Sequence, residues 1–248
     1  IGLFGGGGSI LAVPIFVYLF KLNPVIATSY SMFVVGFSAA IGVLINIKKK
    51  LIEYHTAFVF TLPALVSVSV TRRFIIPNIP DILLSIKDFD ITKEMSIMLF
   101  FSVIIILSSV LMMKKPVAKK IKKINTKKNY VLLVVIGLGV GVLTGTVGAG
   151  GGFIIVPALV VFAKSTIKQA VATSLIIITF NSLIGFSSDL SFLVIEWNFL
   201  ILFTILSVFG IFVGTYISNY VRESTLKISF ARFMILMAVV IIFKELTA

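Results

Sequence analysis

The chain has 248 residues, of which 59% are hydrophobic and only 12% are charged, and it carries a formal net charge of +13. Soluble domains average about 45–50% apolar and about 25% charged residues, so this chain has too few charges to cover a water-facing surface. The composition excludes a disordered chain, a collagen-like chain and a secreted disulfide scaffold, and it indicates a membrane protein. Cysteine is absent, which also excludes thiol catalysis and Cys-ligated metals.

The basic residues are concentrated in two clusters. Three form the run Lys48, Lys49 and Lys50, and eight of the 22 lie in the stretch 114–128. In a membrane protein such clusters mark cytoplasmic loops, and contact with anionic lipid headgroups follows as a secondary effect. No aromatic residue is interleaved in the second cluster before Tyr130, whereas base stacking would need aromatic side chains. We therefore expect no nucleic-acid partner.

Several apolar segments approach or exceed the roughly 20 residues that a helix needs to cross a bilayer. In chain order, we expect membrane helices over 24–47, 54–70, 94–113, 167–187, 197–220 and 224–243. The stretch 130–163 differs, because one straight helix of that length would be about 51 Å long. The helix must therefore be interrupted, and the cluster of glycines predicts the position of the interruption, because glycine destabilises a helix. The interruption comprises Gly148, Ala149, Gly150, Gly151 and Gly152, with Pro157 following.

The same arrangement occurs near the start of the chain, where Gly5, Gly6, Gly7, Gly8 and Ser9 precede Pro14. Aligning 2–14 with 145–157 gives six identities in 13 positions. Further on, Ala27-Thr28-Ser29 matches Ala172-Thr173-Ser174, and Ile52-Glu53 matches Ile195-Glu196. These matches predict a first membrane repeat over 1–113, a basic cytoplasmic linker over 114–129 and a second membrane repeat over 130–248. Residues 130–144 have no counterpart before Ile1, so we expect the first repeat to be truncated at its N-terminus.

The expected fold is an all-α polytopic membrane protein with two homologous repeats and Gly-rich broken helices. It would have about 8–10 crossings, depending on whether each broken segment crosses once or twice. Two crossings would invert the repeats and place Asp189 and Glu196 outside, with the basic residues Lys164, Lys168, Arg222 and Lys227 inside. The basic-residue bias favours this inverted arrangement.

The duplicated pattern resembles the TauE/SafE family of sulfite and organosulfonate exporters, which is grouped with the toluene-sulfonate uptake permeases. The likeness rests on the glycine cluster with its proline at 148–157, Ala-Val-Ala-Thr-Ser at 170–174 and Ile-Glu-Trp at 195–197. It covers essentially the whole chain and implies a multispanning carrier of small sulfur oxyanions or sulfonates. The first half departs from the pattern, since Arg72 and Arg73 stand where the second half has Thr215 and Tyr216.

The glycine clusters are the candidate binding elements. Paired interrupted helices are typical of transporter sites near the bilayer midplane, and irregular backbone is tolerated there only against protein or water. Successive glycines let main-chain amides converge on an anion, while hydroxyl and amide side chains could replace its water. The candidate substrate-binding residues are Gly5, Gly6, Gly7, Gly8, Ser9, Thr28, Ser29, Gly148, Ala149, Gly150, Gly151, Gly152, Thr173, Ser174 and Asn181.

Structural alternatives exist for these residues. Glycines spaced by four favour close helix packing, which is the reading we prefer for Gly137, Gly141 and Gly145, and for Gly210, Gly214 and Ser218. The hydroxyls of intramembrane Ser and Thr residues often bond a carbonyl of the preceding turn instead of a ligand.

The charged residues outside the lysine clusters are expected at the membrane surface. Arg72 and Arg73 close an apolar segment. They could draw anions to a vestibule, but such side chains usually extend to headgroups, which is the interpretation we favour. Glu53 and Glu196 precede interfacial aromatics and suit helix N-termini. No Asp or Glu is expected deep in an apolar segment, which weakens proton coupling through a buried carboxylate. His55 has no second ligand placed with it, so we expect no metal and no cofactor.

The leading hypothesis is a secondary transporter that exports a small sulfur oxyanion, with the paired glycine loops as its site. One negative charge leaving the cell gains about 2.3 kcal/mol per 100 mV, so even a uniport could export. The alternative is a non-transporting membrane scaffold or subunit, and an intramembrane enzyme is a weaker third. The expected partners are a small anionic substrate and the lipid bilayer, the expected location is the bacterial inner membrane, and homo-oligomerisation stays open.

Overall fold

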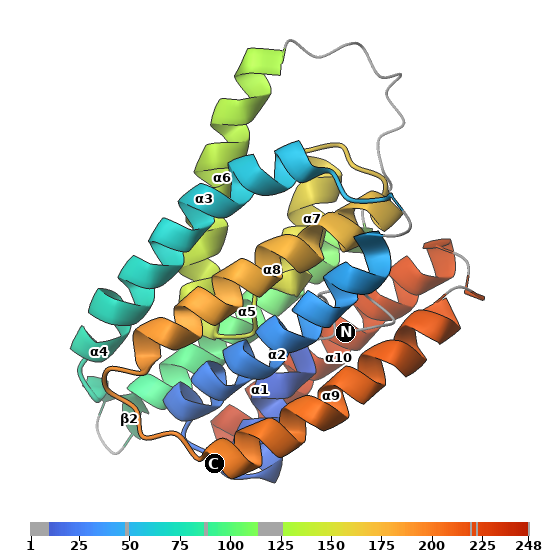
Figure 1. Ribbon diagram of the computed structural model, residues 1–248. Coiled ribbons are helices and arrows are strands. Elements are labelled where there is room, and N and C mark those ends of the chain that lie inside the picture. Colours follow the sequence, from blue (N-terminus) through green and yellow to red (C-terminus); the bar gives the residue numbers. More distant parts are fainter. Residues whose placement is uncertain are drawn as a thin grey trace.

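The computed structural model describes residues 10–47, 50–86, 89–113, 126–218, 220–221 and 223–247 (Figure 1). Its elements in chain order are α1 (Ala12–Pro14), η2 (Ile15–Leu19), α2 (Pro24–Ile47), α3 (Tyr54–Val70), η3 (Thr71–Ile75), α4 (Ile76–Asn78), β1 (Ile82–Ile86), β2 (Phe89–Thr92), α5 (Lys93–Met113), α6 (Thr126–Val147), α7 (Gly152–Val161), α8 (Ile167–Asp189), α9 (Trp197–Ser218) and α10 (Glu223–Thr247). The two η elements are π-helical turns.

The described part of the chain contains six helices that are long and apolar enough to cross a membrane, and α7 is a shorter apolar helix. The six are Pro24–Ile47, Tyr54–Asn78, Lys93–Met113, Tyr130–Val147, Ile167–Asp189 and Trp197–Ile217. Their outward side chains are apolar, as on α9, where Leu202, Leu206 and Phe209 are more than 60% exposed. A surface of this kind requires lipid rather than water around it. The fold is therefore that of a polytopic membrane protein.

Helices α2 and α8 form the centre of the bundle and run antiparallel. Gly36 of α2 lies against Leu183 of α8, whereas Gly42, further along α2, lies against Leu175, earlier in α8. The start of α2 therefore lies beside the end of α8, and the two helices are adjacent along most of their length (Figure 1). We call the two ends of this pair the Asp189 end and the Thr173 end.

Helices α3 and α6 pack side by side in the same direction. Gly137, Gly141 and Gly145 of α6 face Phe60, Ala64 and Thr71, respectively, in successive turns of α3 and η3. A Cβ atom at Gly141 would lie 2.5 Å from the main-chain oxygen of Ala64. The absence of a side chain thus allows the two backbones to approach closely, as in other small-residue helix interfaces.

Two short apolar segments, one before α2 and one before α8, end in the same unusual way. Pro14 lies in α1 and Pro157 in α7. Seven residues after each proline, a lysine adopts the left-handed conformation, with φ of 54° at Lys21 and 56° at Lys164. This conformation is uncommon for residues other than glycine, and here it turns the chain before α2 and before α8.

One structural element differs from the all-helical expectation. Strands β1 and β2 pair antiparallel in a two-stranded sheet between α4 and α5. This connection has no apolar run long enough for a membrane helix, so the hairpin joins two spans without crossing the membrane itself.

The single tryptophan of the chain joins three helices at the Asp189 end. Trp197 begins α9, and its ring contacts Phe33 of α2 and Phe186 of α8, with centroids 6.0 and 6.1 Å away. Because both rings meet the indole nearly edge to face, the contact is of the favourable T-shaped kind.

Candidate functional site

The second glycine cluster forms a buried turn between α6 and α7. Helix α6 ends at Val147 and α7 begins at Gly152. Between them, Gly148, Gly150 and Gly151 have φ values of +71°, +64° and +71°. Glycine adopts this left-handed region without the cost that a Cβ atom imposes. These three left-handed glycines reverse the direction of the chain inside the protein, and Ala149, which lies between them, is fully buried.

The turn lies in the interior against α2, α8 and η3. A side chain at Gly148 would overlap Thr28 of α2 and the guanidinium of Arg72. At Gly150, a Cβ atom would lie 2.5 Å from Val35 Cγ1 and 2.6 Å from Ser182 Oγ. The glycines thus bring main-chain atoms into contact with an arginine and a hydroxyl that a larger residue would keep away.

The amides of this turn are largely unused. In the described chain, the Gly148 amide donates to the carbonyl of Thr144, but no hydrogen bond is found from the amides of Ala149, Gly150 or Gly151. Buried amides without partners are rare in proteins, because each costs roughly 1–3 kcal/mol of desolvation. Such amides can donate hydrogen bonds to a bound anion.

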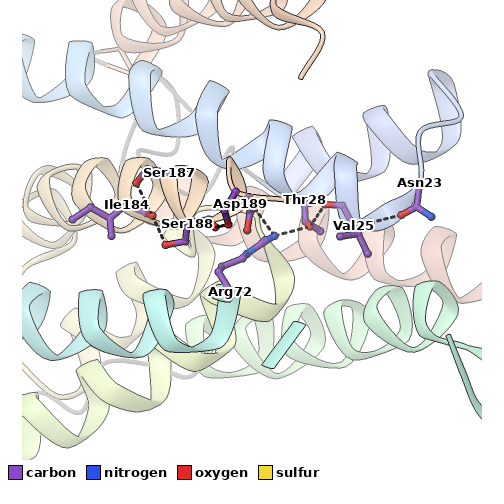
Figure 2. Close-up of polar contacts among 9 residues, drawn as sticks. Asn23, Val25, Thr28, Arg72, Ile184, Ser187, Ser188 and Asp189 are labelled. Carbon is purple, nitrogen blue, oxygen red and sulfur yellow. Dashed lines mark hydrogen bonds and ion pairs between the residues drawn. The ribbon is translucent and has the colours of Figure 1, made fainter. Parts of the chain in front are cut away.

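Arg72 lies at the centre of the Asp189 end and is buried, with 1% of its surface exposed. Its Nη1 atom lies 3.0 Å from Oδ2 of Asp189, which is 0% exposed, and donates to Thr28 Oγ1 at 3.2 Å. Thr28 Oγ1 donates in turn to the carbonyl of Val25. Figure 2 shows the three side chains converging from η3, α8 and α2.

The ion pair leaves several polar atoms without partners. Among the described residues, Nε and Nη2 of Arg72 and Oδ1 of Asp189 are buried and form no hydrogen bond. The same is true of both side-chain polar atoms of Asn181 and of Ser182 Oγ, which lies beside Gly150. A buried guanidinium with its Nε–Nη2 edge free offers two parallel donors, which match two oxygens of a sulfonate, phosphate or carboxylate.

The predicted hydroxyl residues separate into two groups. Thr28 and Ser29 lie at the Asp189 end, and Ser29 Oγ is buried without a partner. Thr173 and Ser174 lie at the opposite end, about 24 Å away along α8 at 1.5 Å per residue. There Thr173 Oγ1 accepts from the Glu53 amide at 3.0 Å, and Ser174 Oγ donates to the carbonyl of Val171. These two hydroxyls are therefore engaged within the protein.

Of the other predicted residues, Asn181 lies inside the α8 span near the glycine turn, whereas Gly5, Gly6, Gly7, Gly8 and Ser9 lie outside the described residues. The described part of the chain brings together Thr28, Ser29, the turn at 148–152 and Asn181 around the middle and the Asp189 end of the α2–α8 pair. It contains no group of three His, Asp or Glu residues close enough to hold a metal ion.

Sequence reasoning missed the charged centre of this site. Arg72 does not extend to headgroups, and Asp189 is buried rather than exposed on an outer surface. Arg73, the neighbour of Arg72, is exposed as expected. A length argument could have found Arg72: the predicted segment 54–70 is shorter than a span requires. The observed span continues to Asn78 and includes Arg72.

The packing interpretation of the spaced glycines holds for Gly137, Gly141 and Gly145 but not for Gly210. Gly137, Gly141 and Gly145 meet α3 closely, but a Cβ atom at Gly210 would have no atom within 4 Å. The prediction of close packing at Gly210 is therefore wrong within this chain, because α9 turns that face away from its neighbours.

Comparison with known proteins agrees with this architecture. The chain is 30% identical over 123 residues to the probable membrane transporter protein YunE of Bacillus subtilis, covering 47% of this chain and 45% of that protein. It is 33% identical over 114 residues to a probable membrane transporter protein of Methanocaldococcus jannaschii, covering 44% of this chain and 43% of that protein. The matched region is thus less than half of each relative. No solved structure matches the chain. The family model described as sulfite exporter TauE/SafE matches residues 1–241, and the chain therefore belongs to this family.

Proposed function

We propose that this protein is a secondary transporter that carries a small sulfur oxyanion or organosulfonate across the membrane. The substrate would bind at the free Nε–Nη2 edge of Arg72, beside the turn at 148–152. The observation that carries the proposal is the buried guanidinium of Arg72, whose Nε and Nη2 donors are unpartnered next to a turn with unpartnered amides.

A buried charge of this kind is costly and requires a reason. Within membrane spans, Arg residues are rare and mark substrate or ion pathways. A purely structural ion pair would be expected to satisfy its remaining donors, because each unsatisfied buried donor destabilises the fold. An anion with three oxygens would satisfy the Nε–Nη2 edge and the turn amides at once, and Ser182 and Asn181 could contribute further donors.

The internal repeat supports a transporter architecture. The first-half helix α2 and its sequence counterpart α8 are antiparallel neighbours, as an inverted repeat requires. Lys21 and Lys164, which correspond in the two halves, share the left-handed conformation after equivalent prolines. We keep the division into repeats at 1–113 and 130–248 around the linker, and about 8–10 crossings if the short segments enter the membrane. Inverted repeats around a central site are typical of secondary carriers.

The repeat also extends the proposed site. By its relation to the turn at 148–152, the cluster from Gly5 to Ser9 would complete the anion site. Thr173 and Ser174, which correspond to Thr28 and Ser29, would line the same pathway nearer the Thr173 end. The Lys-rich linker would face the cytoplasm of a bacterial cell, which places the Asp189 end toward the outside. The membrane potential favours export of an anion that crosses without a coupled ion.

Flux into proteoliposomes tests the proposal. The purified chain would be reconstituted, and uptake of radiolabelled sulfite and of a labelled sulfonate would be measured with and without an imposed potential. We expect saturable uptake by the wild-type protein. Arg72→Gln combined with Asp189→Asn should reduce it to the level of protein-free liposomes, because the anion loses its guanidinium while no unpaired charge is left behind.

The exposed neighbour provides the matched control. Arg73→Gln removes the same charge one residue away and should keep wild-type flux, and a monodisperse size-exclusion profile would establish that each variant is folded. Wild-type flux in the double variant would refute the site at Arg72. Lack of flux for every small oxyanion in the folded wild-type protein would refute transport and favour a scaffold.

A further inference from the structure

The carboxylate of Asp189 has an unusual position for a permanently charged group. It is the last residue of α8, where the free main-chain groups are carbonyls and the helix dipole disfavours negative charge. Its Oδ2 atom pairs with Arg72 Nη1, whereas its Oδ1 atom forms no full hydrogen bond and has the hydroxyl of Ser29 on α2 as the other polar group that stabilises the carboxylate. The ionised form of Asp189 therefore depends on a single cation.

Among the described residues, Asp189 is paired with no second cation, and Lys93, which is buried at the start of α5, donates to the carbonyl of Ile79 instead. Helix α2, which packs against this end, contributes the uncharged Thr28 and Ser29, and neither α2 nor α7 carries a charged side chain. On η3 and α3, which also pack against α8, Arg73 is exposed and His55 lies toward the Thr173 end. Lys168 of α8 itself lies at that end too, as do Lys127 and Lys128 in the first turn of α6. The exposed Glu196 follows in the next connection. The net charge of the buried cluster is thus set by Arg72 and Asp189 together.

Adding a substrate anion changes this balance. With Arg72 charged and Asp189 ionised, the empty site is neutral, and a monovalent anion on the Nε–Nη2 edge would bring its net charge to −1. Uncompensated buried charge is strongly unfavourable in a low-dielectric interior. One proton on Asp189 restores neutrality, because the guanidinium then balances the anion alone.

On this basis, and resting on the proposed function, we infer that Asp189 is the proton-coupling residue of the transporter: it takes up one proton for each monovalent anion bound beside Arg72. Anion and proton then cross together, so the transport cycle is electroneutral for a monovalent sulfonate, and its direction is set by the substrate and proton gradients rather than by the membrane potential. The step forms one O–H bond on the Asp189 carboxyl group and breaks one O–H bond of a hydronium ion in the surrounding water.

The decisive experiment measures protons during anion binding. Methanesulfonate serves as the probe, because it keeps one negative charge throughout the pH range used and cannot itself take up the proton. Purified protein in detergent and weak buffer would be titrated with sodium methanesulfonate while a pH indicator records proton uptake and calorimetry records binding. We expect one proton per bound anion in the wild-type protein.

Variants distinguish coupling from binding. Asp189→Asn mimics the protonated carboxyl, so it should bind methanesulfonate without proton uptake and with an affinity independent of pH. In the wild-type protein, uptake of one proton on binding should raise the Kd about tenfold for each unit by which the pH increases. This holds over the pH range in which Asp189 is ionised in the empty site. Glu196→Gln, which changes an exposed carboxylate in the next connection, should behave as wild type.

The outcomes separate the two proposals. If neither methanesulfonate nor sulfite binds to the folded wild-type protein, the proposed function fails. If the anion binds with no proton uptake and a pH-independent Kd, the function stands and the coupling role of Asp189 is refuted. It is equally refuted if folded Asp189→Asn still takes up one proton. The wild-type stoichiometry requires no variant, so the test holds even if Asp189→Asn does not fold.

Discussion

Arg72 makes its described polar contacts through one nitrogen, Nη1, and Gly148 makes this arrangement sterically possible. The guanidinium touches the turn where any side chain at position 148 would stand. Position 148 therefore combines two requirements, a left-handed backbone and the absence of Cβ. Both belong to the residue itself and can be tested without knowledge of the substrate.

Replacing Gly148 with alanine should destabilise the protein. The left-handed conformation alone costs an L-residue about 1–2 kcal/mol, and overlap with Thr28 and Arg72 adds to this cost. We expect a lower midpoint of thermal unfolding in detergent. Gly210→Ala is the control, because its Cβ meets no atom within 4 Å and alanine favours the helix. Equal melting temperatures for the two variants would contradict the described turn.

The sequence predicts the glycine turn but not its charged partner. The composition of 148–152 and the long apolar stretch around it are local signals, and the structure has its turn there. The pairing of Arg72 with Asp189 joins residues 117 positions apart. Such a contact depends on the packing of α3 against α8, which local patterns do not encode. Each residue viewed alone resembles an ordinary charge at a helix end.

At the scale of elements, the α3–α6 contact depends on small residues. Gly141→Ala should weaken it, since the added Cβ would lie 2.5 Å from the Ala64 oxygen, which is a backbone atom that cannot rotate away. Overpacking of this kind typically costs about 1–3 kcal/mol. Gly139→Ala, two residues away on the same helix, has no atom within 4 Å of its Cβ. Thermal unfolding should therefore separate the two, and equal stability would argue against the described interface.

The start of α8 offers a second test at this scale. Thr166 Oγ1 accepts a hydrogen bond from the main-chain amide of Gln169, and Gln169 Oε1 accepts one from the main-chain amide of Thr166. Together these two bonds form a capping box. Thr166→Ala should cost about 1 kcal/mol, measured as a fall in the unfolding free energy. Thr166→Ser keeps the hydroxyl and should restore most of the loss. Failure of serine to do so would show that the hydroxyl bond is not what stabilises this helix start.

Element boundaries follow well from the sequence where apolarity and length decide them. Helix α2 begins at Pro24 and ends at Ile47, and α5 ends at Met113, as the apolar pattern predicts. The hairpin at β1 and β2 does not follow, because its short strands pair only with each other between two spans. Local patterns also do not predict that α2 contacts α8 in an antiparallel arrangement, although the proposed repeat makes the two helices counterparts.

For the whole molecule, sidedness is the property that most constrains a transport model. The chain has no cysteine, so single cysteines at the exposed positions Thr166 and Ser191 report the two ends of α8. We expect a membrane-impermeant maleimide added to intact cells to label Ser191→Cys but not Thr166→Cys. Labelling of both from outside would contradict a spanning α8, whereas the reverse pattern would contradict the cytoplasmic placement of the linker.

The indole of Trp197 provides an intrinsic optical sensor. It touches one helix from each of the two proposed repeats, and no other tryptophan contributes background emission. Any rearrangement that draws α9 away from Phe33 or Phe186 would change the polarity around the ring and shift its emission wavelength. Stopped-flow fluorescence of the unlabelled protein can therefore time the motion of the bundle directly, turnover by turnover, in the same sample used for flux.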